Sequence, residues 1–366
     1  MSEIESDLKG SWARWVRRHG VALVAYVLAT AFTNSAFMGD SNDYVESVMS
    51  FMSGAGHNFW EFGHLYWRPL GWLLSRVLRP VTQAFVGADE RAGVMLTFLA
   101  VNWVAGLLCA LVLNALLRRV CDREWVANVV TVGFIFSNGF LNYAQSGCSY
   151  VPGLFFLILG IYILVRDGDR PERSWRTAIL AGTSLAVSVC IWFLYGWAIP
   201  AALTPAFFLY GNNAAQRRLV VRTALIFAVV GGLSYLAVIA HLGISNWAEL
   251  KAWIAPHGAP DIKGASRMLF GFARSLINMG NDGAMMKRYL IHDPFNPVTI
   301  SEIFRVSLWK FVFFYLVLAA VVVELLFSRK GRAVLGLLVV NAIPLIGFAL
   351  VFLGGDLERY FGIYPV

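Results

Sequence analysis

Long apolar segments alternate with short charged segments over the whole chain. Most of the apolar segments are long enough to cross a hydrocarbon core about 30 Å thick as helices. A membrane β-barrel would instead show segments of about ten residues with alternating polarity, and this sequence has none. The pattern predicts an all-α polytopic membrane protein with helices over residues 21–38, 92–117, 125–141, 151–165, 177–196, 198–210, 220–241, 307–327 and 333–353.

Two shorter helices are predicted between the first and second apolar segments, with apolar residues on one side only. Tyr44, Val48 and Met52 recur at four-residue spacing, which places them on one helix face. The second helix follows Pro69, and its apolar positions are Leu70, Leu73, Leu74, Val77 and Leu78. Helices of this kind lie in the plane of the membrane interface. We therefore expect interfacial helices inside an external loop over residues 39–91.

Composition supports a membrane protein. Of 366 residues, 58% are hydrophobic and 14% are charged, whereas an ordinary soluble domain has roughly 25% charged residues. The mean hydropathy is +0.64. These values exclude an ordinary soluble enzyme or binding domain.

The net charge of +8 is distributed as the topology of a membrane protein requires. With the N-terminus in the cytoplasm, the inner segments contain 17 Lys and Arg against 8 Asp and Glu, and the outer segments contain 12 against 13. The inner segments are 1–20, 118–124, 166–176, 211–222 and 328–332. The outer segments are 39–91, 242–306 and 354–366. This bias follows the positive-inside rule, so the basic clusters are interpreted as topology signals and we expect no binding of nucleic acid.

The chain reads as one transmembrane domain over residues 1–366, without internal repeats. We expect the first apolar segment to be retained as a signal anchor because it is of full length and an acidic loop follows it. The second external loop, 242–306, has a Pro- and Gly-rich start and a predicted helix near 265–279. A tenth helix is expected to begin at Tyr364, and the sequence leaves open whether the chain is whole or truncated before further C-terminal helices.

The sequence indicates no cofactor. The four cysteines do not have the spacing of a disulfide framework or a zinc site, and no Walker or dinucleotide fingerprint is present. His57 and His64 are seven residues apart and offer a weak alternative as metal ligands. We expect that no cofactor is required, and a divalent cation is allowed but not indicated.

Charged residues concentrate where the chain leaves the first membrane helix. Asp40 is the first residue beyond the predicted helix, and Asp43 follows one helical turn later. Glu61 lies further along the same loop, and Arg68 follows His64 by four positions. A carboxylate can take a proton from a hydroxyl, and a guanidinium can hold a phosphate by charge-assisted bonds. The loop is therefore a candidate site for group transfer from a phosphate-linked donor.

Two motifs in this loop resemble the GT-C superfamily of membrane glycosyltransferases. One is an acidic D-x-x-x-Y motif that opens the external loop, Asp40 to Tyr44, and the other is H-x-x-x-R-P-L, from His64 to Leu70. The pattern is similar to protein O-mannosyltransferases and to bacterial aminoarabinose transferases. Motif identity covers about thirty residues, whereas the similarity in topology covers nearly the whole chain.

The resemblance implies a GT-C-like fold and a sugar donor carried on a polyprenyl phosphate. Asp40 takes the position of the catalytic aspartate, and Asp43 would compensate for Ser41, which stands where the family has a second acidic residue. Tyr44 would support the acceptor site. The implied reaction is a single displacement that inverts the anomeric carbon, on the periplasmic, extracytoplasmic or lumenal face.

The resemblance also implies a set of groups for the donor phosphate. Arg68 is the first candidate, with His64 beside it. Arg359 is the second, because the sequence Glu358-Arg359-Tyr360 is similar to a Glu-Arg-Tyr/Phe element of the family, and Glu358 would support it. The lipid chain would lie in a groove lined by helices six to nine. The aromatic residues expected near this groove are Trp192, Phe193, Tyr195 and Trp197.

Structural interpretations of the same residues stay open. Asp40 or Asp43 would cap the next helix, Arg68 would extend to lipid headgroups, and Arg359 would pair with Asp356 or Glu358. The loop 142–150 lacks the acidic residue that family members often have there.

Two other functions therefore remain as alternatives. The first is a non-catalytic subunit of a membrane complex with a GT-C-like fold. The second is a transporter or lipid flippase, although few charged residues lie at mid-membrane. The sugar and the acceptor, whether protein, lipid or glycan, are not identified by the sequence.

Overall fold

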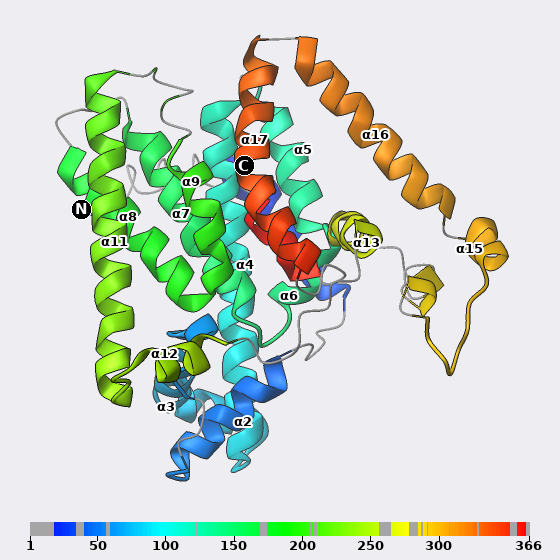
Figure 1. The fold of residues 1–366 in the computed structure, drawn as a ribbon. Coiled ribbons are helices and arrows are strands. Elements are labelled where there is room, and N and C mark those ends of the chain that lie inside the picture. Colours follow the sequence, from blue (N-terminus) through cyan, green and yellow to red (C-terminus); the bar gives the residue numbers. More distant parts are fainter. Residues whose placement is uncertain are drawn as a thin grey trace, which may run out of the picture.

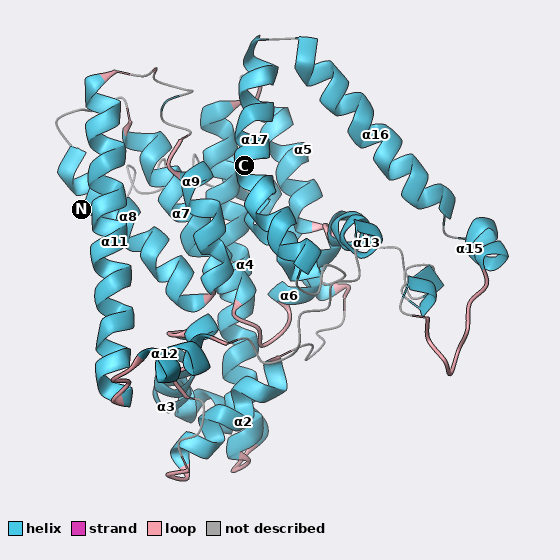
Figure 2. Cartoon of the chain, in the orientation of Figure 1, coloured by secondary structure: helices cyan, strands magenta, loops and turns pink. Residues whose placement is uncertain are grey.

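The computed structural model describes most of the chain, with gaps. The residues described are 18–33, 40–55, 59–121, 123–168, 174–204, 207, 211, 213–255, 265–277, 285–286, 288–290, 292–306, 308–327, 329–351 and 357–363. Within these ranges every regular element is a helix, and no strand is present (Figure 2). The predicted all-α fold class is confirmed.

Long membrane-type helices form the bundle, and short helices occur between several of them along the chain (Figure 1). After a first helix, Arg18–Ala31, the elements of the N-terminal half are α2 (Ser41–Met52), η1 (Phe62–His64), α3 (Trp67–Val86), α4 (Glu90–Val120), α5 (Glu124–Ile135), α6 (Asn138–Ala144), α7 (Tyr150–Asp167) and α8 (Ser174–Ile191). Those of the C-terminal half are η3 (Phe193–Ala198), α9 (Ile199–Ala202), α11 (Ala214–Leu242), α12 (Trp247–Ile254), α13 (Ala265–Leu276), α15 (Ile300–Val306), α16 (Leu308–Phe327), α17 (Arg329–Val351) and η4 (Leu357–Ile363).

Five described helices are long and apolar enough to cross a membrane by length and composition, and a sixth span is present if the bent pair α5 and α6 counts as one. The five are α4, α7, α8, α11 and α16. Shorter apolar helices are Arg18–Ala31, Phe193–Ala202 and Val334–Leu350. Several long apolar helices of this kind support a multi-pass integral membrane protein.

The helices α4, α7, α8 and α11 pack side by side in this order, with α11 at the edge of the bundle (Figure 1). Small residues allow this close packing. A Cβ atom built at Gly182 of α8 would lie 2.7 Å from the backbone oxygen of Thr223 in α11. One built at Gly160 of α7 would lie 2.8 Å from the Leu185 side chain of α8. Glycine at helix contacts is typical of membrane proteins, in which close van der Waals packing drives association.

The two amphipathic helices predicted after the first membrane helix are present as α2 and α3. On α2 the predicted apolar face is buried, with Tyr44, Val45 and Val48 almost fully inaccessible. On α3 the apolar residues Leu73 and Val77 are exposed, as expected for a helix that faces lipid at the interface. Both helices lie with α12 at one end of the bundle, the lower end in Figure 1.

Two predicted helices are interrupted in the structure. The helix expected over 177–196 ends as α8 at Ile191, because Trp192 has extended dihedral angles before η3 begins. The segment expected as a single helix over 125–141 forms α5 and α6, which meet at an angle of 64°. The break occurs because Ser137 has extended backbone dihedral angles, and its hydroxyl donates to the carbonyl oxygen of Phe134 at 2.7 Å. The expected start of a tenth helix at Tyr364 lies outside the described residues.

Candidate functional site

A cavity of about 550 Å³ is lined by residues of α2, α3 and α12, among others. Its wall is built from segments that are far apart in the sequence: the start of α2, the segment 61–68, the start of α7, the start of η3, the end of α12, α17 and η4. The lining residues are Asp40, Asp43, Tyr44, Glu61, Phe62, Gly63, His64, Arg68, Tyr150, Trp192, Phe193, Trp253, Ile254, Ala255, Phe348 and Arg359.

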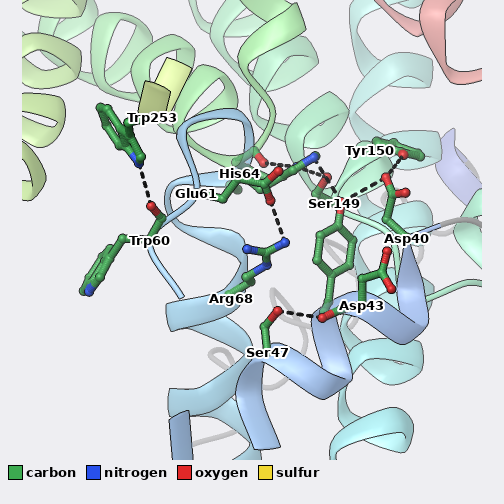
Figure 3. A network of polar contacts seen from close by, with 12 residues as sticks. Asp40, Asp43, Ser47, Trp60, Glu61, His64, Arg68, Ser149, Tyr150 and Trp253 are labelled. Atoms are coloured by element: carbon green, nitrogen blue, oxygen red, sulfur yellow. Dashed lines mark hydrogen bonds and ion pairs between the residues drawn. The ribbon is translucent and has the colours of Figure 1, made fainter. Parts of the chain in front are cut away.

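Asp40 stands immediately before α2, and two tyrosines hold its carboxylate. The hydroxyl of Tyr150 donates to Oδ2 at 2.6 Å, and that of Tyr44 lies 3.4 Å from the same oxygen (Figure 3). Asp40 occupies the N-cap position of α2, but its side chain makes no cap hydrogen bond. Its carboxylate is therefore oriented toward the cavity network and does not cap the helix.

His64 continues the network behind Asp40. Its Nε2 lies 3.1 Å from the Tyr44 hydroxyl, and its Nδ1 lies 2.8 Å from the Ser149 hydroxyl and 3.4 Å from the carbonyl oxygen of Ile191. Burial lowers the pKa of His64 below its ordinary value, and burial also raises the pKa of Tyr44. The network at neutral pH therefore consists of a neutral imidazole and a protonated phenol.

Arg68 lies in the first turn of α3 and forms an ion pair inside the cavity. Its Nη2 is 2.6 Å from Oε2 of Glu61, and its guanidinium is 5.5 Å from the centre of the Tyr44 ring. The Arg68 side chain is 8% exposed and that of Glu61 is 24% exposed. Such burial excludes the alternative in which Arg68 extends to lipid headgroups.

Arg359 approaches the cavity from the C-terminal end of the described chain. It belongs to η4, and its guanidinium lies 5.7 Å from the centre of the Phe348 ring of α17. Trp192, Phe193 and Trp253 add aromatic surface to the wall. The cavity thus combines two guanidinium groups, carboxylates and aromatic rings, a set able to hold an anionic group beside a sugar-sized ring.

The structure brings together most residues that the sequence singled out. Asp40, Asp43, Tyr44, His64, Arg68 and Arg359 all line the cavity. Asp43 is exposed at the rim. The side chains of Glu358 and Asp356, and the whole of His57, lie outside the described residues.

Three residues of the site were not assigned a role from the sequence. Tyr150 and Ser149 belong to the end of the loop that lacks a carboxylate, and they contact Asp40 and His64. Glu61 pairs with Arg68. The sequence offers little indication of these contacts, because only the fold places the start of α7 beside the first external loop. Of the aromatic residues expected near the groove, Trp192 and Phe193 line the cavity, while Trp197 is 46% exposed.

In the comparisons with known proteins, no family profile and no curated protein sequence matches the chain. A solved structure does match: the oligosaccharyltransferase of Archaeoglobus fulgidus in its apo form, with a TM-score of 0.54 and 15% sequence identity. The match covers 97% of this chain and 50% of that one, so this chain spans about half the length of the archaeal protein. At this identity the likeness establishes the fold alone, which is GT-C-like.

Proposed function

We propose that this chain is a membrane glycosyltransferase that moves a sugar from a polyprenyl-phosphate carrier to an acceptor hydroxyl on the external face. One observation carries the proposal. Asp40, Arg68 and Arg359, which are remote in sequence, line one cavity in a GT-C-like bundle. The likeness to an oligosaccharyltransferase supports glycosyl transfer as the class of reaction.

In this mechanism Asp40 is the general base. The hydroxyl groups of Tyr150 and Tyr44 lie on one oxygen of its carboxylate, which orients the group for an acceptor in the cavity. Asp40 takes the proton of the acceptor hydroxyl, and the acceptor oxygen attacks the anomeric carbon. The bond from that carbon to the phosphate oxygen breaks, so the sugar configuration inverts and polyprenyl phosphate leaves.

The two arginines stabilise the leaving phosphate. Guanidinium groups are suited to phosphate oxygens because they present several donors in a fixed plane, and their charge favours the phosphate dianion as it forms. No cofactor is required in this scheme. Burial lowers the pKa of His64, and its contact with the Tyr44 hydroxyl gives it the part of holding Tyr44 in place.

Replacing the base tests the proposal. Asp40→Asn keeps the size of the side chain but cannot accept the proton, so we expect transfer to fall by about 10²–10⁴-fold. The assay uses purified protein in proteoliposomes with radiolabelled undecaprenyl-phosphate-linked sugars and detects label on extracted acceptors. Glu46→Gln is the matched control, because Glu46 is exposed and pairs with Arg91 outside the cavity lining. Unchanged transfer by Asp40→Asn would remove Asp40 from the mechanism.

A non-catalytic role in a membrane assembly is the second candidate, and the loop 142–150 without a carboxylate favours it. Co-purification with other membrane subunits in fixed stoichiometry would support that role, together with no transfer from any of the undecaprenyl-phosphate-linked sugars assayed. Uptake of a solute into proteoliposomes without a transfer product would instead support transport.

A further inference from the structure

We propose that Glu61 is an exchangeable counter-ion of Arg68: its carboxylate neutralises the guanidinium in the empty site and leaves it when the phosphate of the carrier lipid binds. The inference rests on the proposed function, because it concerns the phosphate subsite of the same cavity. It adds a residue that sets the affinity of that subsite.

The ion pair is asymmetric in burial. Arg68 is fixed in the first turn of α3 with its side chain 8% exposed, whereas the Glu61 side chain is 24% exposed on the cavity side. A buried guanidinium needs a counter-charge, since an uncompensated buried charge is costly. Glu61 supplies this charge at 2.6 Å. Of the two partners, Glu61 has the shorter path to solvent, so it is the one that leaves.

The exchange requires only a rotation of the Glu61 side chain. The backbone on both sides of Glu61 is held by residues from the other half of the chain. Trp253 of α12 donates from Nε1 to the carbonyl oxygen of Trp60 at 2.8 Å (Figure 3), and the Tyr235 hydroxyl of α11 donates to that of Phe62 at 3.2 Å. Because the backbone is held and the Glu61 side chain is 24% exposed, the exchange is a side-chain rotation and not the movement of a loop.

Competition for one guanidinium has two consequences. The phosphate must displace Glu61, so the pair weakens binding of the donor. After the reaction the returning carboxylate weakens binding of the polyprenyl phosphate product in the same way, which favours its release. If the Glu61 carboxylate and the bound phosphate both stayed beside Arg68, their negative charges would repel each other at short range.

The experiment measures binding of undecaprenyl phosphate to the purified full chain in detergent, by fluorescence of the cavity tryptophans, with neutral undecaprenol as the uncharged probe. We expect Glu61→Gln to bind undecaprenyl phosphate about five- to tenfold more tightly, and to bind undecaprenol as the wild type does. Glu61→Asp keeps the charge on a shorter side chain. Its affinity for undecaprenyl phosphate should lie between those of the wild type and Glu61→Gln. Glu46→Gln, from an exposed ion pair with Arg91, should bind as the wild type does.

The outcomes separate the inference from the proposed function. In one outcome, Arg68→Gln loses binding of undecaprenyl phosphate, while Glu61→Gln and Glu61→Asp bind it as the wild type does or more weakly. This outcome overturns the counter-ion role and leaves the proposed function standing. Absence of binding in the wild type and in all variants overturns both. Tighter binding of undecaprenol to Glu61→Gln would assign the effect to apolar surface and would also overturn the inference. A melting curve for each variant confirms that the compared proteins are folded.

Discussion

At the scale of single residues, the candidate base is held by hydrogen bonds from two different helices. Tyr150 opens α7, and its hydroxyl lies 2.6 Å from Oδ2 of Asp40. The hydroxyl of Tyr195 in turn donates to the carbonyl oxygen of Tyr150 at 2.6 Å, which fixes the start of α7. In the loop without a carboxylate, Tyr150 thus makes a contact that an ionised carboxylate could not make, because its phenol donates a hydrogen bond to the carboxylate of Asp40.

The Tyr150 hydroxyl gives a prediction at this scale. Tyr150→Phe removes one donor from a charged acceptor, worth about 1.5–3 kcal/mol, so we expect the rate of sugar transfer to fall by roughly 10- to 100-fold. The ring and its packing remain, so any fall in the melting temperature reports the lost hydrogen bond alone. Initial rates in the proteoliposome assay test this, with Tyr162→Phe as control, whose ring lies near Arg166 further along α7. An unchanged rate would show that Tyr150 does not position Asp40.

At the scale of helices, the elements that place the site are packed through small residues. The last residue of α8 provides the carbonyl oxygen of Ile191, and Trp192 of the cavity wall follows directly. Along much of its length α8 packs against α11. At Gly182 the backbone of α11 approaches so closely that a Cβ atom would meet the carbonyl oxygen of Thr223 at 2.7 Å. A backbone carbonyl within a helix cannot rotate away, so the helices themselves would have to separate.

Gly182→Ala is therefore expected to destabilise the protein by about 1–3 kcal/mol, the usual cost of overpacking a close contact. Gly232→Ala on α11 is the matched control, because no heavy atom lies within 4 Å of its built Cβ. Alanine also favours a helix over glycine by roughly 0.8–1 kcal/mol, so the control should be neutral or stabilised. Melting of both variants in the same detergent measures the difference. Equal stability of the two proteins would contradict close packing at Gly182.

At the scale of the whole molecule, the cavity is assembled from both ends of the described chain. Helices could be predicted because their apolar lengths are set by the membrane, and Asp40, His64 and Arg68 because local motifs mark them. The contacts of Tyr150 and Glu61 could not be predicted, since they depend on which helix ends meet in space. The break at Ser137 was also missed, because one residue with extended dihedral angles leaves the apolar pattern unchanged.

The cavity serves an external reaction only if it opens on the external side, and the charge bias predicts that it does. Asn42, exposed at the start of α2 beside the cavity, and Arg123, exposed in the predicted inner segment 118–124, are on opposite sides in this topology. In a Cys121→Ser background, Asn42→Cys should react with a membrane-impermeant maleimide in intact cells. Arg123→Cys should react only after permeabilisation, because the positive-inside rule predicts a cytoplasmic position for the segment 118–124. The reverse pattern would place the cavity on the cytoplasmic side, where its donor and acceptor would have to be sought instead.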